Sequence, residues 1–478
     1  MKPLEVYLES FTRSSASRFA ISLSTDAYQS STLFLHATTN SLGNIAQHLE
    51  NIEAFSGRRN GKNRSGAIHT AFSRCSIYPP RDGRPCFRLD TQIRWIVGVS
   101  AIDTKGPKSA KAQEELRLLN TYFSSGSAQD TSGWSLQDFY ENVHVPPTNR
   151  EVSTRIQSGA INCKLYPFQK RAVDWLLQRE GVSFGEDALT PIQAPESTNA
   201  IIPASFRKMQ DATGNTCYVS HTRGLCVTDF NSIWDAQRAL RGGILAEEMG
   251  LGKTVELIAL MCLHNRQSTS SPIFDAYSGT SVTPSGATLI ITPSSILKQW
   301  KTEINTHAPH LKVLHYKGLP SESALKSNDA AASVENLLEY DVVLTTYSVL
   351  SREVHYANIV PDRNFRHPKK HEPRRSPLVQ ISWWRVCLDE AQMVESGVSQ
   401  AATVARLIPR CNAWAVSGTP LRKDVRDLRG LLIFLRYEPY CSSKTLWGRV
   451  DKGDYFMETS PNVEIICFAD TLIFNSHI

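Results

Sequence analysis

The chain has 478 residues, of which 41% are hydrophobic and 21% charged; this composition excludes disorder throughout and leaves room for about three domains. The formal net charge of +6 is mild for this length, so charge alone does not identify a polyanionic partner. Acidic residues near the amino terminus and the lack of any run of about 20 apolar residues predict a soluble chain that is neither secreted nor membrane-spanning.

The first part of the chain, residues 1–150, predicts a small strand-rich region of unknown role. Short alternating runs at 18–23, 31–35 and 92–99 are separated by clusters of Gly, Pro and Ser, which is typical of strands and turns. The residues there do not point to any particular chemistry.

The ten cysteines are scattered without a Cys-x-x-Cys pair, which favours reduced thiols over a disulfide framework, zinc ribbon or RING. The nearest approach to a metal site is Cys217, His221 and Cys226, which offer three ligands from one loop. Because a fourth ligand is missing, chance spacing is the better interpretation.

From about residue 160 the chain alternates short apolar runs with helical segments, which predicts an α/β domain with a parallel sheet and crossover helices. Polar or glycine-containing residues follow each run at once, so they collect at the carboxyl ends of the strands, where open α/β sheets bind ligands. Two polar stretches near 181–241 and 352–377 are predicted surface insertions. The predicted strands are 243–246, 287–292, 341–345, 385–388 and 413–416.

The strongest chemical signal is Gly-Ile-Leu-Ala-Glu-Glu-Met-Gly-Leu-Gly-Lys-Thr at 243–254. A buried strand runs into a glycine turn that ends in Lys-Thr before a helical stretch at 255–263. Glu247 replaces the first glycine of the strict P-loop pattern, and the alternative is a glycine-rich turn with an exposed lysine. The strand before and the helix after favour a phosphate-binding loop.

Each residue of the turn has a predicted role in holding ATP and magnesium. The turn Gly250-Leu251-Gly252 curls so that backbone amides cradle phosphates. Lys253 supplies positive charge to the outer phosphates, and Thr254 supplies a hydroxyl to magnesium.

A second element is Val-Cys-Leu-Asp-Glu-Ala-Gln at 386–392, on the strand that follows two tryptophans. At such a strand end Asp389 is placed to hold magnesium, and Glu390 to polarise the attacking water, as phosphoryl transfer requires. A third element, Ser417-Gly-Thr419-Pro, closes another strand and by itself is most simply a strand-to-loop turn.

Together the segments 242–254, 389–392 and 417–420 resemble, in order and spacing, motifs I, II and III of helicase-like superfamily-two ATPases. The residues of these motifs are similar to those of the Swi/Snf branch, whose Asp-Glu-Met-Gly-Leu-Gly-Lys-Thr is close to 247–254. The opening segment of that branch resembles Leu-Tyr-Pro-Phe-Gln-Lys-Arg-Ala-Val-Asp-Trp-Leu at 165–176. The sequence Trp-Trp-Arg-Val-Cys-Leu-Asp-Glu-Ala-Gln-Met-Val-Glu at 383–395 is similar to SHPRH-like ubiquitin ligases and their fungal relatives.

The resemblance implies a RecA-like lobe over 160–449, with ATP and magnesium as cofactors and Lys253, Asp389 and Glu390 as catalytic groups. It also implies that Gln169 reads the adenine edge. Residues 450–478 lie outside the resemblance. Two further residues, Ser417 and Thr419, are implied to couple nucleotide state to DNA contact.

Two segments resemble the family's DNA-facing motifs: 292–300, with Pro293 and Ser294, and Thr345-Thr346-Tyr347. Hydroxyls and backbone amides there are implied to hold a phosphate strand without reading sequence. The alternative for both segments is a strand end that caps a helix.

Outside these motifs, a few side chains have two interpretations each. Tyr166 and Phe168 are candidates to stack on adenine, whereas the helical spacing of Trp175 favours core packing. A basic stretch predicts either a phosphate-gripping loop or merely a solvated one. The stretch holds Arg363, Arg366, Lys369, Lys370, Arg374 and Arg375.

The resemblance implies double-stranded DNA or chromatin as partner, a nuclear location and, in full-length relatives, the ubiquitin machinery. Motors of this family have a second lobe whose arginines complete the ATP site, and neither that lobe nor a RING is recognisable here. We therefore expect this chain alone, as a truncated motor, to bind ATP weakly and hydrolyse it slowly. The alternatives are a nucleotide-dependent binding module without turnover and, less favoured, a small-molecule P-loop kinase.

Overall fold

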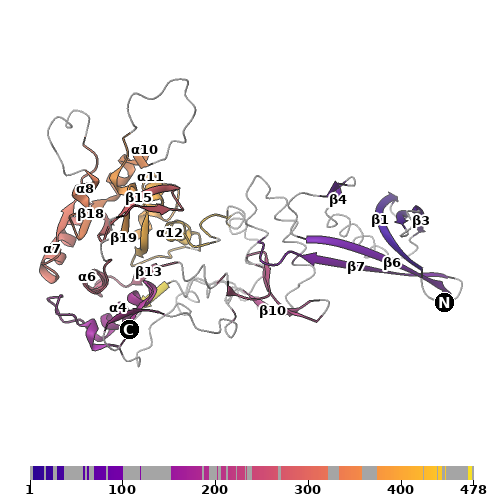
Figure 1. The fold of residues 1–478 in the computed structure, drawn as a ribbon, viewed down its shortest axis with the longest axis horizontal. Coiled ribbons are helices and arrows are strands. Elements are labelled where there is room, and N and C mark those ends of the chain that lie inside the picture. Colours follow the sequence, from indigo (N-terminus) through magenta and orange to yellow (C-terminus); the bar gives the residue numbers. More distant parts are fainter. Residues whose placement is uncertain are drawn as a thin grey trace, which may run out of the picture. The chain divides into compact units, whose positions relative to one another are not determined.

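The structure is a computed structural model of the chain (Figure 1). With further short gaps it describes residues 4–36, 58–100, 119, 152–192, 202–320, 333–357, 374–447 and 472–475; up to residue 94 and for 472–475 it describes the backbone alone. The chain divides into two compact units, each described here by itself. One unit is Met1–Ser127 with Phe206–Asp229, and the other is Ala128–Ser205 with Phe230–Ile478.

The first unit is built from antiparallel strands. One sheet has the order β3-β2-β1-β6-β7, and a smaller sheet has the order β10-β11-β12. The smaller sheet lies within the insertion predicted at 181–241 and groups with the amino-terminal strands. The strands are β1 (Leu4–Ser15), β2 (Arg18–Ser24), β3 (Ser30–His36), β4 (Arg58–Arg59), β5 (Lys62–Asn63), β6 (His69–Arg81), β7 (Arg84–Trp95), β10 (Arg207–Gln210), β11 (Thr216–Ser220) and β12 (Leu225–Val227).

Cys217 and Cys226, which the sequence offers as metal ligands, lie buried on neighbouring strands of the smaller sheet. They pack in an apolar cluster with Leu119 and Val219. Among the described residues no group of three or more His, Cys, Asp or Glu side chains is placed to hold a metal ion.

The second unit is organised around a parallel sheet with the order β17-β18-β16-β19-β20-β13-β21. The β14–β15 hairpin joins the sheet through the parallel pairing of β15 with β19. A separate β8–β9 hairpin follows helix α4 (Pro167–Arg179). The strands are β8 (Val182–Phe184), β9 (Leu189–Pro191), β13 (Gly242–Glu247), β14 (Ile273–Asp275), β15 (Thr280–Pro284), β16 (Thr288–Thr292), β17 (Val313–His315), β18 (Val342–Thr346), β19 (Ile381–Asp389), β20 (Arg410–Val416) and β21 (Leu472–Asn475).

The central strands are buried on both faces, as expected for parallel strands covered by helices. Every residue of β13, β16 and β18 is buried. The five strands predicted from short apolar runs are all present. β19 begins at Ile381, earlier than predicted, because the aromatic Trp383 is itself fully buried in the sheet.

Helices cover both faces of this sheet (Figure 1). One face packs against α4, α6 and α7 in a single apolar cluster that includes Leu176, Leu257 and Trp300. The other face contacts α9 and α12, with α11 packed between them. The helices are α4 (Pro167–Arg179), α6 (Lys253–Leu263), α7 (Leu297–His307), α8 (Val334–Leu337), α9 (Tyr347–Arg352), α10 (Val354–Ala357), α11 (Gln400–Leu407) and α12 (Arg429–Leu435).

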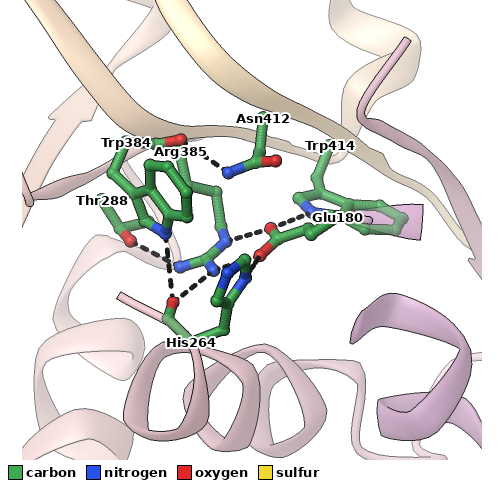
Figure 2. Close-up of polar contacts among 7 residues, drawn as sticks. All are labelled: Glu180, His264, Thr288, Trp384, Arg385, Asn412 and Trp414. Atoms are coloured by element: carbon green, nitrogen blue, oxygen red, sulfur yellow. Dashed lines mark hydrogen bonds and ion pairs between the residues drawn. The ribbon is translucent and has the colours of Figure 1, made fainter. Parts of the chain in front are cut away.

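A buried ionic cluster ties α4 and α6 to the sheet (Figure 2). Glu180, directly after α4, is fully buried and accepts two short hydrogen bonds from Arg385 of β19, at 2.5 and 2.6 Å. The ring nitrogen Nδ1 of His264, which follows α6, lies 2.7 Å from Glu180 Oε2. The indole N–H of Trp414 on β20 donates to Glu180 Oε1 at 2.9 Å. The Arg385 guanidinium also donates to Thr288 of β16, so one carboxylate and one guanidinium join five elements.

None of the helices in the described part of the chain is both long and apolar enough to cross a membrane.

Candidate nucleotide site

The turn between β13 and α6 is shaped by two glycines. Gly250 and Gly252 have φ of 92° and 96°, in the left-handed region that favours glycine. A Cβ added at Gly252 would lie 2.4 Å from the side-chain amide nitrogen of Gln169, so any side chain there would have to displace Gln169. Gly252 is also the N-cap of α6, which directs the amino end of this helix at the turn.

Lys253, the first residue of α6, folds back over the turn. Its ammonium donates to the carbonyl oxygens of Glu247 and Glu248 at 2.8 and 2.9 Å. The charge is therefore held at the mouth of the turn, where phosphate oxygens can replace the two carbonyls as its partners.

Asp389 and Glu390 stand at the carboxyl end of β19, two strands from β13. Asp389 Oδ2 accepts hydrogen bonds from Trp300 Nε1 at 2.5 Å and Thr292 Oγ1 at 3.2 Å. Burial raises the pKa of Asp389, Glu390 raises it further, and the hydrogen bond from Trp300 opposes the shift. Glu390 adopts a left-handed φ of 49°, an uncommon conformation for a residue with a side chain and one that clusters at functional sites.

These groups meet around one cavity with a volume of about 320 Å³. Its lining includes Lys253, Thr254, Trp300, Asp389 and Glu390. The Thr254 hydroxyl and the Asp389 carboxylate are the hard oxygen ligands that magnesium prefers, and the nearby ammonium suits a polyphosphate. The residues present therefore fit a nucleotide with its magnesium ion.

Two buried carboxyl groups lie behind the turn. Glu247, in the position where the strict pattern has glycine, and Glu256 in α6 are almost completely buried. Burial raises the pKa of Glu256 well above its usual range, and neighbouring Glu247 raises it further, whereas Lys253 opposes the shift.

A chain of hydrogen bonds runs from Glu390 to the Ser417–Thr419 turn after β20. Gln392 Nε2 donates to Glu390 Oε2 at 2.6 Å, and Ser417 Oγ donates to Gln392 Oε1 at 2.8 Å. The backbone N–H of Thr419 then donates to Ser417 Oγ at 3.1 Å. The two residues expected to couple nucleotide state to DNA are therefore linked to Glu390.

Gln169 is buried beneath the glycine turn and does not line the cavity. Its Nε2 donates to the carbonyl of Leu251 at 3.0 Å, and its Oε1 accepts the N–H of Tyr166 at 3.0 Å, which caps α4. In this conformation Gln169 supports the P-loop. Tyr166 is mostly exposed and stacks parallel to Phe168, whereas Trp175 is in the core.

The two predicted DNA-facing segments differ in exposure. Ser294 is exposed and Pro293 half-buried. Thr345 is fully buried and donates to the carbonyl of Tyr316, and Thr346 caps α9. Tyr347 is also buried, and its hydroxyl donates to the carbonyl oxygen of Asp389 at 2.8 Å.

The basic stretch falls mostly outside the described residues. Of its six basic side chains only Arg374 and Arg375 are described, and Arg374 donates to the carbonyl of Pro320 at 2.7 Å. Sequence reasoning missed two features of the site, the indole of Trp300 on Asp389 and the cluster around Glu180. A tryptophan shortly after Thr292 is visible in the sequence, but no spacing rule assigns its partner.

Comparison with curated proteins gives partial matches to much longer chains. The "Uncharacterized ATP-dependent helicase IRC20" of Saccharomyces cerevisiae is 30% identical over 303 residues, 59% of this chain and 19% of that protein. The human "E3 ubiquitin-protein ligase SHPRH" is 43% identical over 171 residues, 34% of this chain and 10% of that protein. "DNA repair protein RAD5B" of Arabidopsis thaliana is 31% identical over 317 residues, 62% and 22% respectively.

The chain thus spans about a fifth or less of the length of these relatives. Among solved structures, the Sulfolobus solfataricus SWI2/SNF2 ATPase core domain matches 70% of this chain and 47% of that one, at 20% identity and a TM-score of 0.39; at that score the likeness adds nothing to the fold described above. The model of the SNF2-related domain matches residues 168–454, more than half of the chain and all of the site just described. The chain belongs to the SNF2-related domain family.

Proposed function

We propose that this chain carries the ATP-binding lobe of a double-stranded-DNA-dependent ATPase that translocates along DNA, of the chromatin-remodelling and DNA-repair type. The motor lobe spans 160–449, with 1–150 and 450–478 outside it. The observation that carries the proposal is the meeting of Lys253, Thr254, Asp389 and Glu390 around one cavity.

In this proposal the described residues divide the work of phosphoryl transfer. The turn Gly250-Leu251-Gly252 binds the phosphates through its backbone amides, and Lys253 leaves its two carbonyl partners for phosphate oxygens. Thr254 and Asp389 hold magnesium, which supplies charge neutralisation to the transferred phosphate.

Glu390 orients the attacking water. Gln392 holds one Glu390 carboxylate oxygen at 2.6 Å and itself accepts the hydroxyl of Ser417, so the orientation of the base depends on Ser417. A shift of the Ser417–Thr419 turn on DNA binding therefore reaches the residue that activates water. This arrangement supports a turnover that depends on DNA.

DNA as partner is supported by the names of two relatives, "DNA repair protein RAD5B" and "DNA repair protein RAD5A", and by the exposed Ser294 beside the site. In this proposal the chain acts in the nucleus, near chromatin. The name "E3 ubiquitin-protein ligase SHPRH" extends the proposal to partners in the ubiquitin machinery for the longer proteins.

The first test is nucleotide binding by the purified chain, measured with a fluorescent ATP analogue and Mg²⁺. Lys253→Ala removes the charge at the mouth of the turn, and we expect the affinity to fall at least tenfold, about 1.4 kcal/mol or more. Lys312→Ala, an exposed lysine outside the cavity lining, is the matched control and should bind as the unaltered chain does. Equal binding by both variants would contradict the proposed site.

The second test separates the motor from a nucleotide-dependent binding module, which is the alternative function. ATP turnover is measured with and without double-stranded DNA, with Glu390→Gln as control. DNA-stimulated turnover that Glu390→Gln abolishes, while analogue binding persists, supports the motor. Binding without any stimulated turnover in the unaltered chain supports the module instead.

A further inference from the structure

Trp300 makes the shortest polar contact to the proposed magnesium carboxylate. It lies on α7, only 3% of its surface is exposed, and its Nε1 donates to Asp389 Oδ2 at 2.5 Å. An indole has a single N–H donor, so the whole hydrogen-bonding capacity of this side chain is spent on Asp389. Trp300 also lines the cavity shared by Lys253 and Asp389.

The Asp389 carboxylate is held from several sides. Oδ2 takes two donors, Trp300 and the Thr292 hydroxyl at 3.2 Å, and Oδ1 takes the backbone N–H of Glu390 at 3.0 Å. The Tyr347 hydroxyl donates to the backbone carbonyl oxygen of Asp389. Because a carboxylate oxygen accepts about two hydrogen bonds, Oδ2 is saturated and the remaining capacity lies on Oδ1.

We propose that Trp300 is a positioning residue for magnesium, whose indole N–H fixes the Asp389 carboxylate so that Oδ1 is presented to the ion. The inference rests on the proposed function. Carboxylates that bind metals are themselves commonly oriented by hydrogen bonds, and loss of such a partner typically costs 10- to 100-fold in metal affinity.

The indole suits this role because of its size and rigidity. The side chain belongs to the buried apolar cluster that includes Ile304 and Leu344, which restricts its movement, while the N–H reaches from the helix to the end of β19. A flexible donor such as lysine would add charge and would not fix a single direction. Phenylalanine keeps the packing and lacks only the donor.

The test compares Trp300→Phe with Trp384→Phe in the full chain. Trp384 also donates its N–H to a single protein acceptor, the carbonyl of His264 at 3.1 Å, but it lies in the cluster of Figure 2 and not at the cavity. Each variant therefore loses one indole hydrogen bond. The readout is the ratio of ATP-analogue affinity in Mg²⁺ to that in EDTA, which isolates the contribution of the metal.

We expect Trp300→Phe to lower this ratio about tenfold, and Trp384→Phe to leave the ratio unchanged. Thr292→Val removes the other donor to the same oxygen and should also lower the ratio. This variant replaces Trp300→Phe in the test if thermal melting shows that Trp300→Phe does not fold. A Trp300→Phe or Thr292→Val chain that folds and keeps the unaltered ratio overturns the inference and leaves the proposed function standing. An unaltered chain whose analogue binding ignores Mg²⁺ contradicts the proposed function itself.

Discussion

At the scale of single residues, the site depends on a few positions where the backbone conformation favours glycine. Gly252 combines a left-handed φ with a neighbour 2.4 Å from where its Cβ would stand. Gly250 has the same kind of backbone conformation but open space around it. The two glycines therefore allow backbone strain to be separated from collision.

Gly252→Ala should weaken ATP-analogue binding more than Gly250→Ala does. Both substitutions force an alanine into the left-handed region, which costs about 1–2 kcal/mol. Only the Gly252 variant also pushes Gln169 away from the Leu251 carbonyl and distorts the phosphate turn. Titration of the analogue against both variants checks this, and equal losses would show that the contact with Gln169 does not matter.

The residues of the turn and of the Asp-Glu pair were predictable because their spacing along the chain is local. Trp300 was not, since its partner Asp389 is 89 residues away and the contact depends on how α7 packs on the sheet. Thr345 and Tyr347 show the same limit, because their types suggest phosphate contacts and the structure gives their hydroxyls to backbone carbonyls.

At the scale of elements, α4 is fixed at both ends. Its first turn contacts the P-loop through Gln169, and Glu180 after its last turn binds Arg385 on the strand that carries Asp389. Strand positions followed from short apolar runs, whereas this pairing joins residues 205 apart and has no signature in the sequence.

Glu180→Gln should destabilise the chain at neutral pH by about 3–5 kcal/mol, because it leaves the Arg385 charge buried without its partner. Glu303→Gln is the control. The Glu303 carboxylate lies 3.1 Å from the ring nitrogen of His307 on α7, both side chains are partly exposed, and loss of this contact should change the free energy of unfolding by about 1 kcal/mol or less. Denaturant unfolding of both variants measures the difference.

The same contact fixes the direction of a pH dependence. Burial alone would raise the pKa of Glu180, but Arg385 and His264 together hold it below its usual value. A group with a lowered pKa in the folded state stabilises above its unfolded pKa, about 4.3 for Glu, and loses this contribution as the pH falls towards the folded value. The difference in the free energy of unfolding between the unaltered chain and Glu180→Gln should therefore become smaller below about pH 4.3. A difference that stays constant with pH in unfolding experiments would contradict the ion pair.

At the scale of the whole chain, the sequence predicted a strand-rich region followed along the chain by an α/β lobe. The order of strands in the sheet of that lobe explains why motifs that are distant in the sequence meet. β20 lies between β13 and β19, so the carboxyl ends of three neighbouring strands carry the P-loop, the Ser417–Thr419 turn and the Asp-Glu pair. Strand β21 pairs in parallel with β13 although it lies outside the family match, because an edge strand offers unpaired backbone groups to any short strand-forming run. Such pairing is set by the fold and not by a motif, so it was not predictable.

The central claim is that a triphosphate binds between Lys253 and Asp389. A crystal structure of the chain with Mg²⁺ and a non-hydrolysable ATP analogue tests it most directly. We expect the phosphates in the glycine turn, the Lys253 ammonium moved from the Glu247 and Glu248 carbonyls to phosphate oxygens, and the metal ion at Thr254 and Asp389. A nucleotide bound elsewhere, or a Lys253 that keeps both carbonyl partners beside the bound nucleotide, would contradict the account.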